Sequence, residues 1–367
     1  MSINITEYVL KHGNELFDYL PFNDVDALIF AQLAYSHWEV IAPTFDNFDA
    51  KPLAIRNITL EMNNKINRGE FDSIEARSLF KALITAERYK NVKVQYVLKH
   101  DDLRSNKQFY AVTFTLPSGI TIISFRGTDF TLNGWKEDAM LSFEEKVSSQ
   151  KAAVDYVEKI MGTREGKFYI VGHSKGGNLS YYSAIFMHRD FKKRLIKAYS
   201  FDGPGFNDKA LFQKYAYTSI KSKLVRYLPQ DDVVGVLLHL DDSPIILKSR
   251  GVGVIQHNPF LWQIGDNNNF VILNKRTHTS KIFEKSMDNF LETLTNQEKK
   301  DIVDAIFTLA GEDANVIDMA KHIPTTTRRF MVAYKDMPSD RKKQLFNNFM
   351  KFLGIVASTT VSYVKDK

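Results

Sequence analysis

A sharp turn between an apolar strand and a helix constrains this chain most. Residues 168–171 (Phe-Tyr-Ile-Val) are typical of a buried strand, and residues 176–190 have a helical pattern. Between them lies a Gly-x-Ser-x-Gly pattern at 172–176. A serine on such a tight turn holds its hydroxyl above the end of the sheet, while the two glycines avoid collisions with the neighbouring strand and helix. The pattern predicts that Ser174 is a nucleophile.

The surrounding sequence alternates between strands and helices. Residues 1–90 have a helical pattern, and the chain becomes helical again after about residue 280. Between these parts, the sequence predicts a helix at 151–161 and further strands at 92–98, 109–116, 120–125, 196–201, 223–227 and 245–248. Alternation of this kind predicts an α/β fold with a mostly parallel central sheet and helices on both faces.

The same pattern predicts three parts of the chain. Residues 1–90 form a helical part packed on the core, residues 91–280 form the α/β core, and residues 281–367 form a helical C-terminal extension. Stretch 345–364 is apolar but interrupted by Asn347, Asn348 and Lys351, so we expect an amphipathic helix and not a membrane span. The first residues lack a secretory signal, and we expect a cytoplasmic protein.

Composition excludes several function classes. The chain has no cysteine, which excludes disulfides, thiolate catalysis and cysteine-based zinc sites. Its net charge of +6 is mild, and no basic stripe interleaved with aromatic residues indicates a nucleic-acid partner. Neither a phosphate-binding loop, a dinucleotide fingerprint nor a His-Glu-x-x-His pattern is present, so we expect no cofactor and no metal.

A second glycine-containing turn follows the predicted strand at 120–125. Residues 122–129 read Ile-Ile-Ser-Phe-Arg-Gly-Thr-Asp, and Trp135 and Asp138 come shortly afterwards. This arrangement resembles the class 3 lipase family, in which an Arg-Gly-Thr or Arg-Gly-Ser turn donates a backbone N–H to the oxyanion hole and a Trp-x-x-Asp segment holds that turn. The resemblance implies that Thr128 is one oxyanion donor. The other predicted donor is the backbone N–H of Lys175, the residue after the nucleophile.

The chain is still more similar to an uncharacterised bacterial branch of these lipase-like α/β-hydrolases. The similarity extends to about residue 275 and is carried by residues 21–26, 172–179, 201–205 and 256–259. It implies an α/β-hydrolase fold with helical N-terminal and C-terminal extensions. It also implies hydrolysis of a carboxylic ester.

In this fold the base and the acid follow the nucleophile in the order Ser, acid, His. His257 lies in a loop after a predicted strand and precedes Trp262, where class 3 lipases have their histidine, so it is the predicted base. His239 and His278 remain alternatives.

The acid is less sharply defined. Asp231 and Asp232 follow the predicted strand at 223–227, and the sequence there resembles the lipase pattern of an aspartate followed by an apolar residue and valine. That resemblance points to Asp232, with Asp231 and Asp202 as alternatives.

We therefore expect a serine hydrolase that cleaves a small-molecule or lipid ester through an acyl-serine intermediate. A thioesterase or acyltransferase would use the same groups, and a degenerate hydrolase scaffold with a binding or regulatory role is the alternative from another class. The side chain of Lys175 opposes the dipole of the following helix, so it either attracts an anionic group or points into water.

The predicted C-terminal helix suggests a further partner. Its apolar residues recur at helical spacing with basic residues nearby, namely Phe346, Phe349, Met350, Leu353 and Val356 beside Lys342, Lys343 and Lys351. Such a face packs within the chain or against a second copy, or it makes a peripheral contact with an anionic membrane.

Overall fold

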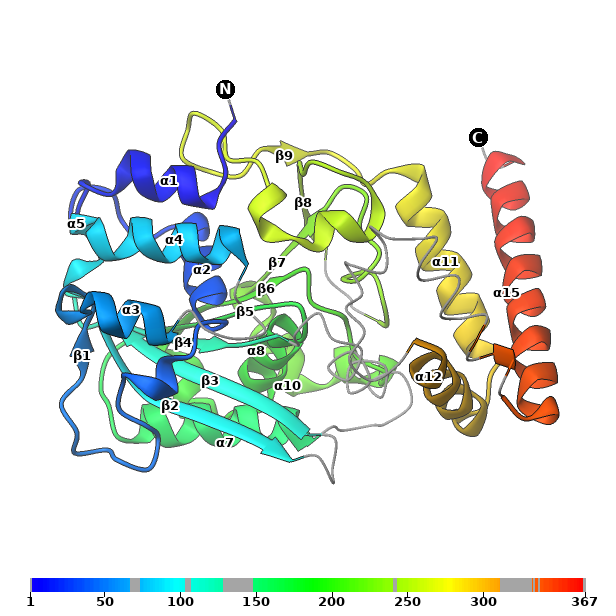
Figure 1. Cartoon of the computed structure of the whole chain (residues 1–367), viewed down its shortest axis with the longest axis horizontal. Helices are drawn as coiled ribbons and strands as arrows, with labels where there is room; N and C mark the ends of the chain where they lie inside the picture. The colour runs from blue at the N-terminus through cyan, green and yellow to red at the C-terminus, as the bar shows by residue number, and fades with distance from the viewer. Residues whose placement is uncertain are drawn as a thin grey trace.

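The computed structural model describes residues 2–66, 73–102, 107–127, 148–239, 243–310, 332, 334–335 and 337–365. Within these residues a single nine-stranded sheet has its strands in the order of the sequence (Figure 1). The strands are β1 (Leu53–Ala54), β2 (Lys93–Asp102), β3 (Lys107–Thr115), β4 (Thr121–Phe125), β5 (Phe168–His173), β6 (Leu195–Phe201), β7 (Leu224–Pro229), β8 (Ile245–Leu247) and β9 (Ile272–Leu273). Strands β4 to β8 are parallel, and the remaining neighbours pair antiparallel. The predicted α/β class and parallel central sheet are confirmed.

One face of this sheet is covered by the helices that connect the parallel strands. Crossovers between parallel neighbours are right-handed as a rule, so a sheet wound in one direction carries its connecting helices on one side. These helices are α7 (Ser148–Gly162), α8 (Lys175–Phe186), α9 (Arg189–Arg194) and α10 (Tyr215–Thr218). Side chains of α7 and α8 form one hydrophobic cluster with Ile123 and Ile170 of the sheet.

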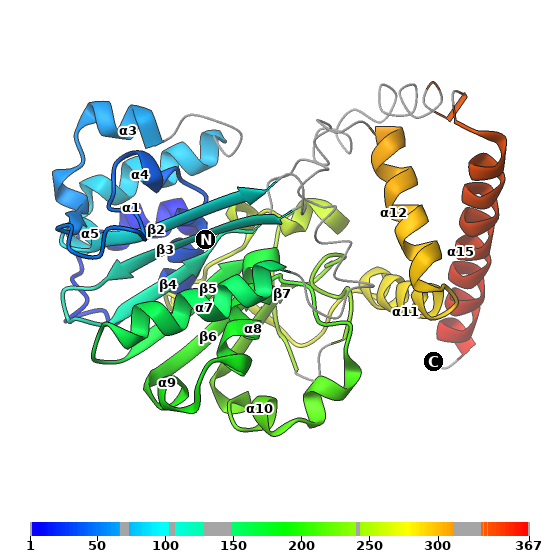
Figure 2. The ribbon, with the colours of Figure 1, turned by 90° about the horizontal axis from the view of Figure 1, so that it is seen from below.

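The N-terminal helices cover the opposite face (Figure 2). They are α1 (Ile5–His12), α2 (Asp24–Leu33), α3 (Leu60–Ile66), α4 (Ile74–Thr85) and α5 (Glu87–Lys90). Because side chains alternate along a strand, Ile122 and Val171 point to this face while Ile123 and Ile170 point to the other. A sheet buried on both faces needs this second layer, and here the N-terminal part of the chain supplies it.

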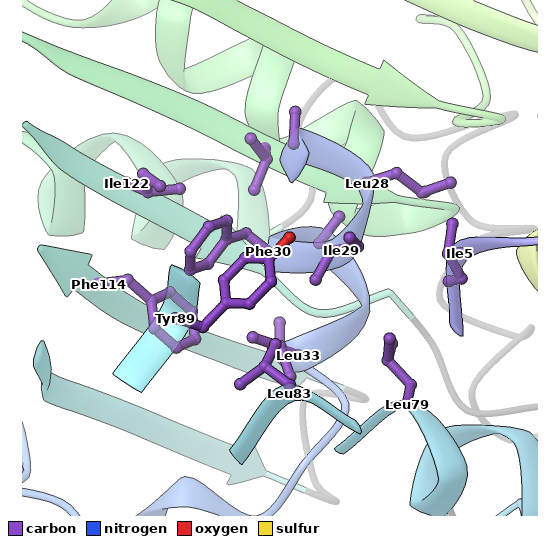
Figure 3. Packing of buried hydrophobic residues seen from close by; sticks show 14 of the residues in the cluster. Ile5, Leu28, Ile29, Phe30, Leu33, Leu79, Leu83, Tyr89, Phe114 and Ile122 are labelled. Atoms are coloured by element: carbon purple, nitrogen blue, oxygen red, sulfur yellow. The ribbon is translucent and has the colours of Figure 1, made fainter. Parts of the chain in front are cut away.

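Helix α2 lies at the centre of the N-terminal layer (Figure 3). Asn23 caps its first turn by accepting hydrogen bonds from Val25 and Asp26. Nearly all of its residues are buried, and Phe30 packs with its ring centroid 5.1 Å from that of Phe114 on β3. Since burial of one such aromatic side chain contributes about 2–3 kcal/mol, α2 anchors this layer to the sheet.

A buried ion pair fastens α5 to α2. The guanidinium of Arg88 donates from Nε and Nη2 to the carboxylate of Asp26 at 3.1 and 2.5 Å, and both side chains are fully buried. Tyr89 donates to the same carboxylate at 2.7 Å, and Nη1 of Arg88 donates to the carbonyl oxygens of Glu15 and Leu20. These hydrogen bonds offset the cost of removing the charges of Arg88 and Asp26 from water.

The described C-terminal part is helical, with α11 (His278–Glu292), α12 (Asn296–Ala310) and α15 (Ser339–Lys365). Helix α15 lies along α11, where Phe352 packs edge-on against Phe290 with ring centroids 5.2 Å apart (Figure 1). Gln344 also donates to Asp301 of α12 at 3.2 Å. Among the helices described, none combines the length and apolar character needed to cross a bilayer.

Candidate active site

The turn between β5 and α8 holds Ser174 in a strained conformation. Its φ of 58° lies in the left-handed region, which non-glycine residues rarely occupy and which costs about 1–3 kcal/mol. The backbone N–H of Ser174 donates to the carbonyl oxygen of Phe201 at 2.9 Å, so the turn is tied to the end of β6.

The glycines on either side of Ser174 are required by close backbone contacts. A Cβ atom at Gly172 would lie 2.0 Å from the carbonyl oxygen of Gly176, and one at Gly176 would lie 2.2 Å from the carbonyl oxygen of Phe125. Neither backbone has room to give way. The predicted role of these two glycines is confirmed.

His257 contacts the carboxylate of Asp202. The imidazole Nδ1 lies 2.7 Å from Oδ2 of Asp202, and both side chains are buried. His257 ends the short 3₁₀ helix Gly253–His257. Asp202 follows β6 with a φ of 52°, and its N–H donates to Tyr227 on β7 at 2.9 Å. Ser174 and Asp202 thus stand at the ends of neighbouring parallel strands.

The predicted acid, Asp232, is not the carboxylate that holds the imidazole. Its Oδ1 accepts hydrogen bonds from the backbone N–H groups of Val234 and Gly235 at 2.8 and 3.1 Å. Gly235 N–H also donates to Oδ1 of Asp202 at 3.1 Å, so the two carboxyl groups meet at this residue. The assignment of Asp232 as the partner of His257 must therefore be corrected to Asp202, because Asp232 turns back into its own loop.

The two carboxyl groups have raised pKa values. Burial raises the pKa of Asp202 to about 6. Burial and the neighbouring charge of Asp202 raise the pKa of Asp232 well above its usual range. Arg226 moderates the pKa of Asp202, and its Nη2 donates to the carbonyl oxygen of Gly235.

Asp231, the other alternative, braces the loop that carries His257. Its Oδ2 accepts from Gly253 N–H at 2.8 Å, and its own N–H donates to the side chain of Gln256 at 2.8 Å. Thr277, which caps α11, donates its hydroxyl to Oδ1 of Asp231. Asp231 therefore ties the loop after β7 to the histidine loop and to α11.

Of the two predicted oxyanion donors, the structure describes Lys175 but not Thr128. Thr128, Trp135 and Asp138 lie outside the described residues. Gly127, directly before Thr128, lies against the turn, since a Cβ atom there would be 3.0 Å from Cβ of Ser174. Lys175 begins α8 directly after Ser174, which is the position that an oxyanion donor next to the nucleophile is expected to have. Its side chain is 2% exposed and donates to the carbonyl oxygen of Gln108 at 2.7 Å, so it does not point into water.

The remaining predicted alternatives for the base lie elsewhere. His278 starts α11 and contacts the hydroxyl of Tyr363 at 2.8 Å. His239 pairs through its backbone with Phe206.

A comparison with known protein families matches residues 83–308, more than half of the chain, to one family. The chain belongs to the Mbeg1-like family. A search of curated proteins gave no match. The Mbeg1-like segment contains the elbow serine, Asp202, Asp232 and His257.

Two residues beside the site of this Mbeg1-like chain were missed in the sequence. The ring of His173 packs against that of His257 in a tilted arrangement, with centroids 4.6 Å apart. Its Nε2 donates to the carbonyl oxygen of His257 at 3.0 Å, and its Nδ1 accepts from the hydroxyl of Tyr35 at 3.1 Å. Burial, and then the neighbouring His257, lower the pKa of His173 well below its usual value, so the ring is neutral. Tyr35 follows α2 and lies outside the matched segment.

Trp262 completes the support of the histidine loop. Its indole N–H donates to the carbonyl oxygen of Gln256 at 2.7 Å, and the ring is fully buried. The position of His173 within the Gly-x-Ser-x-Gly pattern was a usable signal, because this residue necessarily adjoins Ser174, the predicted nucleophile. Within the described residues, no cluster of three His, Asp or Glu side chains is arranged to hold a metal ion.

Proposed function

We propose that this Mbeg1-like chain is a serine hydrolase with an α/β-hydrolase fold related to that of class 3 lipases. It cleaves a carboxylic ester through an acyl-serine intermediate, with Ser174 as nucleophile, His257 as base and Asp202 as acid. The observation that carries the proposal is the 2.7 Å contact between His257 and Asp202, beside the strained turn that carries Ser174. An aspartate on one imidazole nitrogen next to an elbow serine is the arrangement that activates a hydroxyl.

The reaction follows from these roles. His257 takes the proton of the Ser174 hydroxyl as Oγ attacks the ester carbonyl carbon, and Asp202 stabilises the imidazolium that forms. The N–H groups of Lys175 and Thr128 bind the oxyanion, and one such donor contributes about 3–4 kcal/mol to the transition state. The imidazolium then protonates the leaving alkoxide, and water releases the acyl group by the same steps in reverse. A thioester would react with the same groups.

A fluorophosphonate probe tests the proposal. The wild-type protein is expected to react covalently through one hydroxyl, because only an activated serine displaces the fluoride of the probe and becomes phosphonylated. Ser174→Ala removes that hydroxyl and should abolish labelling, which gel fluorescence and peptide mass measure. Ser180→Ala changes a buried serine of α8, the helix that follows Ser174, and is the matched control that should label normally. An unlabelled wild type that is folded by circular dichroism would favour a degenerate scaffold with a binding role.

A lipid ester as substrate is favoured by the outer face of α15. Phe346, Phe349, Met350 and Leu353 are 43–56% exposed there, while Val356 is half-buried. The same helix carries Arg341, Lys342, Lys343, Lys351 and Lys365 against one carboxylate, Asp340. Equal charges oppose pairing of two such helices, whereas an anionic lipid surface complements them.

We expect the full chain to float with vesicles containing anionic lipid and not with purely zwitterionic vesicles. Phe346→Ser/Leu353→Ser should reduce the bound fraction at least about tenfold, because two side chains that insert among the acyl chains are lost. Leu60→Ser/Ile74→Ser changes residues that are 75% and 80% exposed on other helices and should float normally. If the first variant instead leaves vesicle binding unchanged and dissociates a dimer seen by light scattering, α15 binds a second copy of the chain.

A further inference from the structure

The loop after β7 places a second buried carboxyl group directly behind the acid of the proposed triad. Gly235 N–H donates to both Asp202 and Asp232, each at 3.1 Å. A Cβ atom at Gly235 would lie 2.5 Å from Oδ1 of Asp202 and 3.0 Å from Oδ2 of Asp232, so both oxygens border the same point. Asp202 and Asp232 are 0% and 1% exposed.

Two carboxylates this close in a buried site cannot both be ionised, so the pair retains one proton. The contacts of Asp202 are those of an anion, because it accepts from Nδ1 of His257 and from Gly235 N–H. Oδ1 of Asp232 accepts two backbone N–H groups, whereas its Oδ2 is buried with no hydrogen-bond donor in the described part of the chain. A proton on this oxygen removes the need for a donor.

We propose that Asp232 is a positioning residue that stays protonated and donates a hydrogen bond from Oδ2 to Asp202, which keeps Asp202 ionised and aimed at His257. This inference rests on the proposed function and extends the triad to a fourth residue. Asp232 touches neither substrate nor the reacting atoms, so it acts only through Asp202.

The other charged groups that face the pair agree with this distribution of the proton. His257 approaches Asp202 from the 3₁₀ helix Gly253–His257, and Arg226 approaches from β7. The hydrogen bond from Asp232 lowers the pKa of Asp202 and so offsets part of the effect of burial. Without this donor, the pKa of Asp202 would be higher, so Asp202 would already be protonated at a higher pH than in wild type. A protonated Asp202 no longer stabilises the imidazolium.

Two variants of Asp232 separate its donor from its charge. Asp232→Asn retains an acceptor for the loop N–H groups and an N–H donor for Asp202, and it carries no charge. Asp232→Ala removes the donor. We expect the pH profile of fluorophosphonate labelling to stay near wild type in the Asn variant. In the Ala variant the acidic limb of this pH profile should move to higher pH by about one unit. Labelling near neutral pH should therefore be slower than in wild type.

Two labelling results would overturn the inference. If the Ala variant keeps the wild-type profile, Asp232 does not act on Asp202. If the Asn variant loses as much activity as Asp202→Asn, Asp232 itself is the required anion. A folded wild type that never labels would instead count against the proposed function. The protonation of Asp232 must therefore also be measured by a method that does not depend on activity.

Urea unfolding between pH 4 and pH 8 provides that readout. Unfolded aspartate loses its proton near pH 4, whereas folded Asp232 retains it. The contribution of Asp232 to stability therefore falls as pH rises above about 4, because folding must take up this proton. Asp232→Asn has no such proton, so its urea midpoint should exceed that of wild type at pH 7, and the difference should shrink toward pH 4. A difference that is constant over this range would show that Asp232 retains no proton.

Discussion

Asp202→Asn is expected to lower kcat/KM for a p-nitrophenyl ester by about 10³- to 10⁴-fold. The carboxylate accepts a hydrogen bond from Nδ1 of His257 at 2.7 Å, and this fixes the tautomer in which Nε2 can accept the serine proton. An amide at this place can donate its N–H to Nδ1, which leaves the proton on Nε2 and the base unable to act. Initial rates over a series of ester chain lengths measure the loss, which should fall on kcat and not on KM.

Asp232→Asn is the matched control for this change. It makes the same substitution in the same buried pair, and we expect a rate within about tenfold of wild type because the amide still donates an N–H to Asp202. A reversed order, with Asp232→Asn inactive and Asp202→Asn active, would restore Asp232 as the acid of the triad. Equal and small effects of both changes would mean that no carboxylate orients His257 during the reaction.

The elbow and the histidine loop could be predicted because their signals are local. A strand, a glycine pair and a helix in immediate succession define the turn at Ser174 without knowledge of the remaining fold. The order Ser, acid, His that is expected for this fold, together with the loop context, then favoured His257 among the histidines after Ser174.

The carboxylate that contacts His257 could not be predicted in the same way, because its identity depends on contacts that are distant in the sequence. Asp231 and Asp232 occupy the loop that family resemblance favours, yet the first braces Gly253 and the second accepts N–H groups of its own turn. Aspartate often satisfies neighbouring backbone in this manner. Asp202 reaches His257 because β6 is the direct neighbour of β5, which only the strand order shows.

Tyr35 illustrates a second limit. Its contact with His173 exists because the N-terminal helices cover the face of the sheet that the connecting helices leave open. The sequence predicted a helical N-terminal part, but a helical pattern does not reveal which loop of that part ends beside His173.

The N-terminal layer itself can be tested at its buried ion pair. Arg88→Met is expected to lower the free energy of unfolding by about 3–5 kcal/mol, because it leaves the carboxylate of Asp26 buried without its cation. The loss should exceed that of Tyr89→Phe, which removes one hydrogen bond to the same carboxylate and costs about 1–2 kcal/mol. Urea unfolding followed by circular dichroism measures both.

A double variant separates the uncompensated charge from lost packing. Asp26→Asn removes the negative charge, so Arg88→Met/Asp26→Asn should be more stable than the sum of the two single changes predicts, by about 1–3 kcal/mol. Arg88 also packs with its guanidinium carbon 4.0 Å from the ring centroid of Phe17, a contact that methionine partly preserves. If the effects of the single changes simply add, the cost of Arg88→Met comes from this packing and from the lost carbonyl contacts, and the ion pair does not hold α5 to α2.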